Sequence, residues 1–426
     1  MSKTIKKIEP VSRVKARIRL PGSKSVTHRA LLMAALAQGE SQIKNPLVAE
    51  DTLLTAKALE QLGAEMQWGE QIVRVIPAQK RWKEPHGPIF LGNSGTSTRL
   101  LLAVAATGTG EFLFDGSPRL RERPIGPILE ALKTLGVQCQ CLGQEGYPPV
   151  KIISRGLAGG EVWVDAGQSS QFLSALLIAS PCARKEMRVG WHEPIASFPY
   201  VALTLSMMEE VGIEYRWSGT NRIIVPAPQP YPALKYTVEG DCSSASYFWA
   251  AAALTQGEVY THPISPGSSQ GDCRLLEVME NMGCRVQWEE EGVTVSGPER
   301  LKAVDLDMNK MPDMVPTIAV LAAFAEGHTR IRNVAHLRVK ESDRLHVVAM
   351  ELSKLGVPVR ELPDGLEIDG GHAHTPDTGL EAHDDHRIAM AFALAGLCVK
   401  GVEIHGAESV AKSFPTFWDV FAQLQP

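Results

Sequence analysis

Short polar motifs alternate with apolar helical stretches along this chain in a regular pattern. Six polar motifs each run directly into a predicted helix of small apolar residues, and they occupy residues 22–25, 92–96, 167–171, 240–244, 309–313 and 383–387. Each stretch ends at a polar stop, and the stops, marked by Gly39, Gly110, Lys185, Gly257, Gly327 and Gly401, lie 71, 75, 72, 70 and 74 residues apart. Such even spacing indicates a repeated structural unit. Because a helix N-terminus attracts anions, the pattern also suggests as many as six anion sites.

A second predicted helix recurs in step with the first. It ends at Gly63, Gly136, Gly212, Gly283 and Gly356, which lie 73, 76, 71 and 73 residues apart. Glycine at this place favours the left-handed conformation that ends a helix. Short alternating runs follow each helix, at residues 73–76, 150–153, 223–225, 293–295 and 366–368, and predict strands. The repeat is therefore a motif, a helix, a strand, a second helix and a strand pair.

The repeat also predicts how the chain is divided into domains. The natural cuts lie just before Gly22 and just before Gly240, with three units on each side. The first domain would comprise residues 1–21 with 240–426, and the second residues 22–239. The sixth unit lacks strands after its second helix, while a strand predicted at 14–20 has no helix before it. We therefore expect the N-terminal strand to complete the sixth unit.

Composition and charge exclude several classes of protein. With 426 residues, 44% of them hydrophobic and 21% charged, the chain is typical of a globular protein. The longest nearly apolar run, Ile388 to Val399, is too short to span a bilayer. A net charge of −5 argues against general nucleic-acid binding. The seven cysteines show neither metal-ligand nor disulfide-framework spacing, so we expect a reduced, cytoplasmic protein without metal.

The polar motifs contain cations and acids in an unequal arrangement. Lys24 lies at a predicted helix N-terminus with Arg29 one turn on, where the helix dipole disfavours cations unless an anion is bound. Residues 338–345 place Arg338, Lys340, Glu341 and Arg344 close together. Asp313 could be only an N-cap and Glu341 only a surface acid, yet two carboxylates beside an anion site could also perform acid–base chemistry. The first motif lacks the spacing of a phosphate loop, which argues against a nucleotide triphosphatase.

These motifs resemble those of a known family. The blocks PGSKSVTHRALL, GNSGTSTRLL, RERPI, SSQFLSALL, SSASYF, RVKESDRL, DHRIAMAFAL and KSFP occur in the order found in 5-enolpyruvylshikimate-3-phosphate (EPSP) synthases, between Pro21 and Pro415. The resemblance implies an α/β fold of two similar domains, each with three βαβ-type units, the inside-out barrel of the enolpyruvyl transferases. It also implies transfer of the enolpyruvyl group of phosphoenolpyruvate to the 5-hydroxyl of shikimate 3-phosphate, through a tetrahedral intermediate and without a metal or organic cofactor.

The resemblance assigns residues to three roles. The catalytic residues would be Lys24, Asp313 and Glu341. The residues that would bind shikimate 3-phosphate are Lys24, Ser25, Arg29, Ser169, Ser170, Gln171, Ser197, Tyr200, Asp313 and Lys340. The residues that would bind phosphoenolpyruvate are Lys24, Asn93, Gly95, Arg123, Gln171, Arg344, Arg387 and Lys412. Both partners are small anions, and we expect a monomer that binds neither nucleic acid nor membrane. Because the motifs lie in both halves of the chain, we also expect the domains to close on substrate. His336 stands where many members have Asn or an acid.

Two alternatives remain. A sister enzyme with the same architecture transfers enolpyruvate to UDP-N-acetylglucosamine. That family has a reactive cysteine in a loop, but the matching segment of this chain, residues 112–124, contains no cysteine. A non-catalytic polyanion-binding module is the other alternative. Asp313 and Glu341 disfavour that module, because capture of an anion gains nothing from carboxylates beside it.

Overall fold

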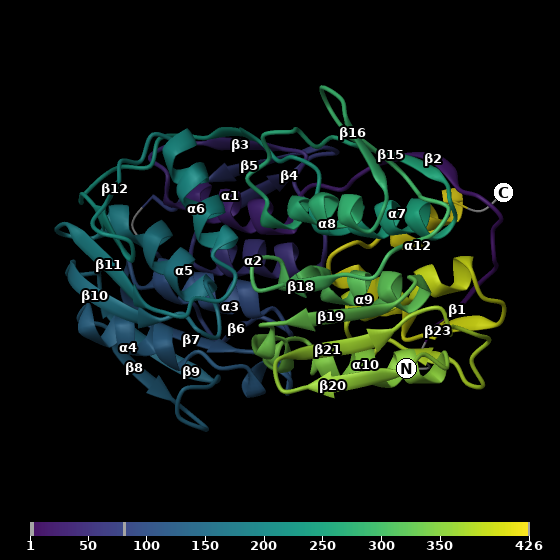
Figure 1. The fold of residues 1–426 in the computed structure, drawn as a ribbon. Helices are drawn as coiled ribbons and strands as arrows, with labels where there is room; N and C mark the ends of the chain where they lie inside the picture. Colours follow the sequence, from purple (N-terminus) through teal and green to yellow (C-terminus); the bar gives the residue numbers. More distant parts are fainter. Residues whose placement is uncertain (1–3, 80–81, 425–426) are drawn as a thin grey trace. The chain divides into compact units, whose positions relative to one another are not determined.

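The computed structural model describes residues 4–79 and 82–424 (Figure 1). The chain divides into two compact units, Met1–Ser23 with Glu239–Pro426, and Lys24–Val238. We call the first the split unit, because it is made of two chain segments, and the second the continuous unit. The boundaries expected from the repeat, before Gly22 and Gly240, lie next to these.

The continuous unit contains three copies of the predicted helix pair. The helices that follow polar motifs are α1 (Lys24–Leu36), α3 (Gly95–Ala105) and α5 (Gln171–Ala179). Their partners are α2 (Glu50–Gln61), α4 (Gly126–Thr134) and α6 (Pro199–Glu210). The three partner helices end at Gly63, Gly136 and Gly212, whose φ angles of 105°, 88° and 80° are left-handed. The predicted role of these glycines in ending helices is confirmed.

Each helix pair of the continuous unit is accompanied by a four-stranded sheet. The first sheet has the strand order β14 (Lys235–Thr237), β3 (Ser41–Lys44), β5 (Ile72–Ile76), β4 (Glu65–Trp68). The second has the order β6 (Ile89–Phe90), β7 (Thr109–Asp115), β9 (Val150–Arg155), β8 (Gln138–Cys141). The third has the order β10 (Gly160–Asp165), β11 (Met187–His192), β13 (Arg222–Val225), β12 (Arg216–Trp217). In each sheet the first pair of strands is parallel and the other two pairs are antiparallel. β14 is the last strand of the continuous unit, and it pairs with β3 of the first sheet. The end of this unit therefore joins its beginning.

The split unit repeats the same arrangement. Its helices are α7 (Cys242–Leu254), α8 (Leu275–Asn281), α9 (Val315–Phe324), α10 (Arg344–Lys354), α11 (His386–Ala393) and α12 (Phe417–Phe421). Two four-stranded sheets have the orders β16 (Arg285–Trp288), β17 (Val293–Ser296), β15 (Glu258–His262), β2 (Lys15–Arg19), and β18 (Asp305–Asp307), β19 (His328–Arg332), β21 (Gly365–Asp369), β20 (Val359–Leu362). The third sheet has three strands, β1 (Ile5–Ile8), β23 (Val402–His405) and β22 (Leu380–Glu381).

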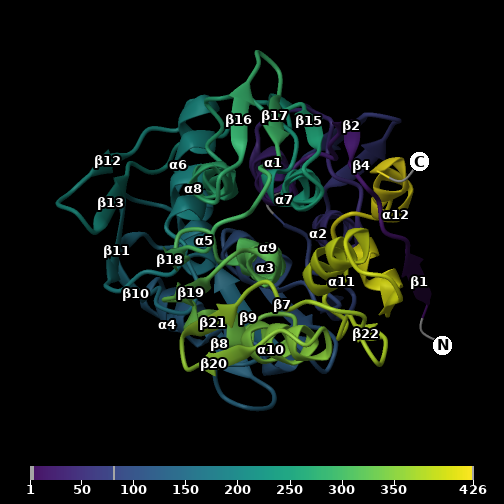
Figure 2. The ribbon, with the colours of Figure 1, turned by 45° about the vertical axis from the view of Figure 1, so that its right-hand side comes forward.

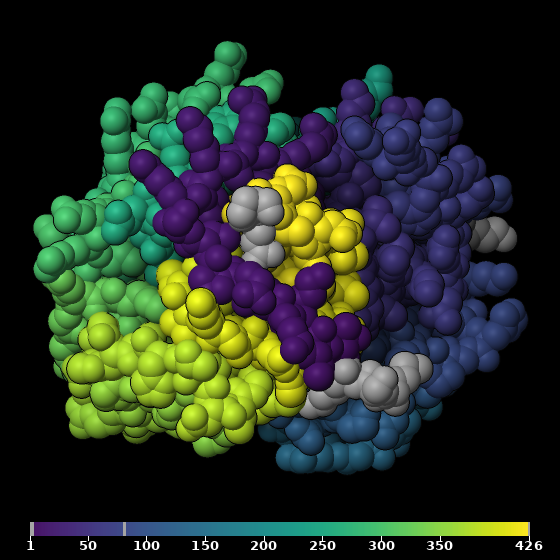
Figure 3. All heavy atoms as spheres, turned by 90° about the vertical axis from the view of Figure 1, so that its right-hand side faces the viewer, coloured from purple at the N-terminus to yellow at the C-terminus, as the bar shows by residue number. Residues whose placement is uncertain are grey.

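The N-terminal segment corrects one expectation. The strand predicted at 14–20 forms as β2, but it pairs in parallel with β15 of the fourth unit and so does not complete the sixth. The sixth unit is completed by β1, which pairs antiparallel with β23 and was not predicted. In Figure 3 the purple N-terminal residues accordingly lie over the yellow C-terminal ones. Only four residues long and exposed on three of them, β1 has no hydrophobic alternation by which sequence could reveal it.

Small apolar residues explain why the first helices of each repeat lie inside. In the split unit α9 packs against both α7 and α11, and Figure 2 shows these helices gathered within the sheets. Residues 242–253 of α7 and 315–323 of α9 are buried on every side. A helix that is apolar all round must be buried, so the alanine-rich sequences suit central positions. Within residues 4–79 and 82–424, no helix is long and apolar enough to cross a membrane.

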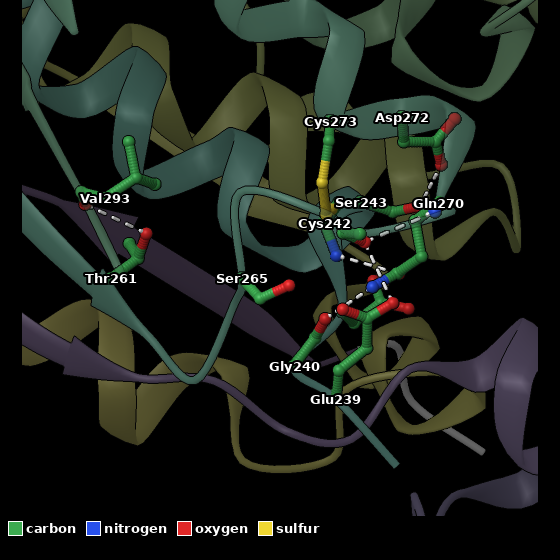
Figure 4. Close-up of a disulfide and its surroundings, with 12 residues drawn as sticks. Glu239, Gly240, Cys242, Ser243, Thr261, Ser265, Gln270, Asp272, Cys273 and Val293 are labelled. Atoms are coloured by element: carbon green, nitrogen blue, oxygen red, sulfur yellow. Dashed lines mark hydrogen bonds between the residues drawn. A yellow bond between two sulfur atoms is a disulfide. The ribbon is translucent and has the colours of Figure 1, made fainter. Parts of the chain in front are cut away.

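The cysteines correct a second expectation. Cys242, the first residue of α7, and Cys273, in the 3₁₀ turn η3 (Gly271–Arg274), form a disulfide with a Cα–Cα distance of 5.4 Å (Figure 4). The sequence showed no disulfide-framework spacing. The two cysteines are 31 residues apart and become neighbours only because η3 packs against the N-terminal end of α7. The other five cysteines are free.

Candidate active site

The helix N-termini of the repeat are not equivalent anion sites. The side chains of Ser94, Asp241 and Asp385 accept hydrogen bonds from backbone N–H groups at the starts of α3, α7 and α11. An N-cap side chain occupies a donor that an anion would otherwise use. The six motifs therefore do not offer equal anion sites, in line with their unequal side chains, and the binding chemistry depends on particular residues.

Lys24 begins α1 in the continuous unit, as its motif predicted. Its Nζ lies 3.2 Å from Oδ2 of Asp51, in the first turn of α2, and the two side chains are 13% and 2% exposed. A partly buried ion pair fixes a flexible lysine in one place while its charge stays in the site. Lys24 is therefore held ready for an anionic group.

Arg29 is one of the most buried cations of the continuous unit, at 1% exposure. Its Nε donates to Oγ1 of Thr204 at 2.7 Å, and its Nη2 donates to Oγ of Ser174 and the carbonyl oxygen of Tyr200, both at 3.1 Å. Its Nη1 donates to the carbonyl oxygen of Ser25 at 2.9 Å. Burial lowers the pKa of Arg29 to about 10, so it remains a cation at neutral pH. These bonds tie α1 to α5 and α6, and direct contact of Arg29 with substrate stays a prediction.

A second polar network joins α3, α5 and the segment before α4. Gln171 accepts a hydrogen bond from Nη1 of Arg99 and donates one to Oγ1 of Thr96, both at 2.9 Å. Arg123 donates from Nη1 to the backbone carbonyl of Asn93 at 2.9 Å. The guanidinium of Arg123 lies against Gly95, where an added Cβ would stand 2.6 Å from its Cζ. Gly95 therefore leaves the space in which Arg123 lies.

The predicted shikimate-binding hydroxyls lie at two neighbouring helix starts. Ser169 and Ser170 precede α5, and Ser169 Oγ accepts from the backbone N–H of Gln171 at 3.3 Å. Ser197 and Tyr200 lie at the start of α6, which packs against α5. Ser197 has a left-handed φ of 56°, a conformation that non-glycine residues adopt rarely and often at functional sites. The structure thus places these four residues together.

Arg344 is the centre of a charged cluster in the split unit. The side chain is 1% exposed, and its Nε and Nη2 donate to the two carboxylate oxygens of Asp385 at 2.8 and 3.2 Å. Its Nη1 also donates to Asp313 and its Nη2 to Glu341, each at 2.9 Å. The fork of an arginine is suited to several planar carboxylates at once. The two acids predicted to be catalytic are therefore held by one buried guanidinium.

Asp313 lies between two arginines. Oδ1 accepts from Arg344, and Oδ2 accepts from Nη2 of Arg387 at 2.9 Å. Burial by itself would raise the pKa of Asp313, but the charges of Arg387, Lys340 and Arg344 outweigh burial and hold it well below its usual range. Asp313 is thus ionised, as a group that accepts a proton must be.

The remaining predicted residues of the split unit lie close to this cluster or near its helices. Lys340 precedes Glu341, and its charge acts on Asp313. Lys412 ends the 3₁₀ segment η7 (Ala407–Lys412), which packs against α11, and it is 5% exposed. His336 is buried, and burial followed by the charge of Lys340 lowers its pKa to about 4, so the ring is neutral. No group of three or more metal-ligating His, Cys, Asp or Glu side chains occurs among the residues that the structure describes.

Sequence reasoning missed three polar residues of this cluster. Asp385 is fully buried and accepts from Arg344, from Ser342 Oγ and from the backbone N–H of Arg387. Ser243 Oγ accepts from Arg387 at 3.4 Å and donates to Asp272. The position of Asp385 directly before a helix was a usable signal. Asp272 gave no such signal, because it reaches the cluster only through tertiary packing.

Asp272 is an acid of the cluster whose pKa is raised by burial. Burial, followed by the negative charge of Asp313, raises its pKa to about 6, whereas Arg387 and the Ser243 hydroxyl favour the carboxylate. The folded protein therefore holds this proton more tightly than the unfolded chain does. Its stability should fall as pH rises from about 4 to about 6, because the unfolded chain ionises first.

Asp272→Asn should remove this pH dependence. Two pKa units correspond to about 3 kcal/mol, so the variant should gain stability relative to the parent by up to that amount between pH 4 and pH 7. Urea unfolding of both proteins at each pH measures the difference. A stability difference that does not change with pH would show that Asp272 titrates normally.

Comparisons with known proteins identify the family of this chain. The family model described as EPSP synthase (3-phosphoshikimate 1-carboxyvinyltransferase) matches residues 8–421. The chain belongs to the EPSP synthase family. A protein named 3-phosphoshikimate 1-carboxyvinyltransferase from Syntrophobacter fumaroxidans is 63% identical over 420 residues, which are 99% of each chain. One of the same name from Nostoc punctiforme is 42% identical over 413 residues, 96% of each chain.

Solved structures support the same family. The structure titled EPSP synthase from Acinetobacter baumannii has a TM-score of 0.82 with this chain at 29% identity, and covers 99% of this chain and 98% of its own. The expected α/β fold of the enolpyruvyl transferases is therefore confirmed. The resemblance indicated by the sequence motifs between Pro21 and Pro415 is therefore confirmed.

Proposed function

We propose that this chain transfers the enolpyruvyl group of phosphoenolpyruvate to the 5-hydroxyl of shikimate 3-phosphate and releases inorganic phosphate. Membership of the EPSP synthase family supports this reaction. The observation that carries the assignment to particular residues is the pairing of Asp313 with both Arg344 and Arg387. It joins an ionised base to two cations that suit a substrate with a carboxylate and a phosphate.

The continuous unit would bind mainly shikimate 3-phosphate. Ser169, Ser170, Ser197 and Tyr200 are gathered at the starts of α5 and α6, and hydroxyl groups at helix starts suit a phosphate and ring hydroxyls. Gln171 begins α5, and Ser25 and Arg29 belong to α1 of the same unit. We assign these three residues to this substrate together with Lys340.

Cations would bind phosphoenolpyruvate. We assign Arg344, Arg387 and Lys412 of the split unit, and Lys24 and Arg123 of the continuous unit, the latter supported by Asn93 and Gly95. Arginine binds carboxylate and phosphate through paired N–H groups, so this set suits both anionic ends of the substrate.

The reaction would proceed by addition and then elimination. The oxygen of the 5-hydroxyl attacks C2 of phosphoenolpyruvate while Asp313 accepts the proton of that hydroxyl. Glu341 and Lys24 supply the proton that C3 gains. In the elimination C3 loses a proton, the C2–O bond to phosphate breaks, and the enolpyruvyl ether forms. The cations stabilise the charge on the leaving phosphate.

The pairing of Asp313 implies that substrate binding prepares the base. While Arg344 and Arg387 donate to Asp313, its pKa is too low for an effective base. Phosphoenolpyruvate would compete for the same guanidinium N–H groups and weaken their hold on Asp313. The pKa of Asp313 would then rise, so the carboxylate would become a stronger base when both reactants are present.

An activity assay tests the proposed function. Phosphate should be released only when shikimate 3-phosphate and phosphoenolpyruvate are supplied together. Equal or greater turnover with UDP-N-acetylglucosamine as acceptor would contradict the assignment and favour the sister enzyme. Binding of both anions without turnover would favour a polyanion-binding module.

We also propose a cytoplasmic monomer. Phosphorylated substrates do not cross a bilayer unaided, which supports a location where they are made. One chain contains all the residues assigned to the reaction, so no second copy is needed. Sedimentation equilibrium should give a mass near 46.3 kDa.

A further inference from the structure

The Cys242–Cys273 disulfide (Figure 4) is flanked in sequence by Ser243 and Asp272, although no step of the proposed reaction uses it. Each cysteine is the chain neighbour of a residue that contacts the charged cluster of the split unit. Ser243 follows Cys242, and Asp272 precedes Cys273. The covalent bond therefore joins the two backbone segments that bring Ser243 and Asp272 together.

Ser243 and Asp272 connect the disulfide to Arg387. Ser243 Oγ donates a hydrogen bond to Asp272 and accepts one from Nη2 of Arg387 at 3.4 Å. The same Nη2 donates to Asp313 at 2.9 Å. The exposed fractions of Ser243, Asp272 and Arg387 are 9%, 4% and 6%, so water screens these contacts little. A shift of Ser243 would alter the position of a guanidinium assigned to phosphoenolpyruvate.

The disulfide is the strongest link between η3 and the start of α7. Gln270 adds two hydrogen bonds, accepting from the backbone N–H of Cys242 at 3.1 Å and donating to the carbonyl oxygen of Gly240 at 2.7 Å. Figure 4 shows these hydrogen bonds together with the sulfur bridge. Without the bridge the two segments would be joined only by hydrogen bonds, which exchange with water far more readily than a covalent bond breaks.

We propose that Cys242–Cys273 is a redox-modifiable site whose disulfide holds Ser243 and Asp272 in the position that orients Arg387 for phosphoenolpyruvate. The consequence for substrate binding rests on the proposed function of Arg387. Intracellular disulfides are commonly redox-sensing rather than structural, which suits a pair beside a site for small anions. Ser243 and Asp272 act through Arg387 and are positioning residues.

The modification is a thiol–disulfide exchange with a dithiol. One thiolate of the dithiol attacks Sγ of Cys273, which is partly exposed, and the Cys242 sulfur leaves as a thiolate that takes up a proton. The second thiolate of the dithiol then attacks the mixed disulfide and releases Cys273 as a thiol. Two electrons and two protons pass to the protein, and the dithiol becomes a disulfide. The N-terminus of α7 favours the leaving thiolate of Cys242.

Counting thiols tests the bond itself. The chain has seven cysteines, of which five are free in the structure. When the protein is denatured without reductant in the presence of an alkylating agent, five cysteines should be labelled. When the folded enzyme is first treated with dithiothreitol and then denatured and alkylated, seven should be labelled, with the two new labels on Cys242 and Cys273. Seven labels without reductant would overturn the proposal.

Kinetics test the consequence. Reduction should raise KM for phosphoenolpyruvate by at least about tenfold, the factor expected from loss of one hydrogen bond to a charged group, with little change in KM for shikimate 3-phosphate. Reoxidation with oxidised glutathione should restore the original KM. Two extra labels with an unchanged KM would overturn the proposal, whereas an enzyme without any turnover would instead contradict the proposed function.

Variants separate the disulfide from other thiol effects. Cys242→Ser with Cys273→Ser should have the raised KM permanently and should not respond to dithiothreitol. Ser243→Ala, which keeps the bridge, should raise KM to a similar extent and show no further rise on reduction. Cys398→Ser, which removes an exposed free thiol, should respond as the parent does. A double variant that still responds to reductant would contradict the proposal, and the reversible redox cycle of the parent gives the same test if that variant does not fold.

Discussion

Asp313→Asn is expected to lower kcat by about 10²- to 10⁴-fold, the range for loss of a general base. The amide is nearly isosteric with the carboxylate but cannot take the proton of the attacking hydroxyl. KM for phosphoenolpyruvate should not rise, because Arg344 and Arg387 lose the carboxylate that competes for their N–H groups. Steady-state phosphate release and calorimetric binding of each substrate measure the two effects separately.

A matched control for this variant is Asp305→Asn. Asp305 also accepts from an arginine, Arg332, at 2.8 Å, but the two side chains are 59% and 46% exposed. An exposed pair of this kind contributes little, so the control should keep full activity and stability. If Asp313→Asn retained the parental kcat, Asp313 would have no part in proton transfer and its role would be structural.

Arg344→Ala is expected to lower both stability and activity. Removal of this guanidinium leaves Asp385, Asp313 and Glu341 without their shared cation inside the split unit. Loss of one partner of a buried ion pair costs about 3–5 kcal/mol, because uncompensated charge remains buried. Urea unfolding should therefore show a lower midpoint, and KM for phosphoenolpyruvate should rise by at least about tenfold.

Two further variants identify why Arg344→Ala loses stability and affinity. Arg344→Lys keeps the charge but loses the fork, so it should recover part of the stability and little of the affinity for phosphoenolpyruvate. Arg338→Ala is the matched control, because Arg338 pairs with Asp343 and Glu361 but is 28% exposed. Parental stability of Arg344→Ala at neutral pH would show that the three carboxylates do not depend on this arginine.

Much of the fold could be predicted because the repeat is local. The six polar openings, the glycines that end α2, α4, α6, α8 and α10, and the main strand of each complete unit all form where the pattern indicated. Helix ends and strand alternation depend on neighbouring residues, which a sequence displays directly. Strand pairing is not local, so β2 was predicted as a strand but assigned to the wrong sheet.

The candidate site divides in the same way. Glu341 and Arg344 were singled out because cations and acids gather in residues 338–345, and Asp313 because it opens an apolar helix. Asp272 lies far from those segments and was missed, since only the packing of η3 against α7 brings it to Ser243. For Arg29 the motif suggested a cation that contacts substrate. The structure shows in addition that its guanidinium donates to four partners inside the continuous unit, which the sequence did not indicate.

By itself the sequence determined the repeat, the helices and strands, the family resemblance and most of the charged residues that we assign to the substrates. These properties follow from periodicity, end signals and short motifs, which involve residues near one another in the chain. Only the tertiary structure decided that β1 completes the sixth unit, that Arg344 and Arg387 share Asp313, and that Cys242 is bonded to Cys273. Each of these contacts joins residues far apart in sequence, and their chemistry depends on distance and burial, which only the folded chain sets.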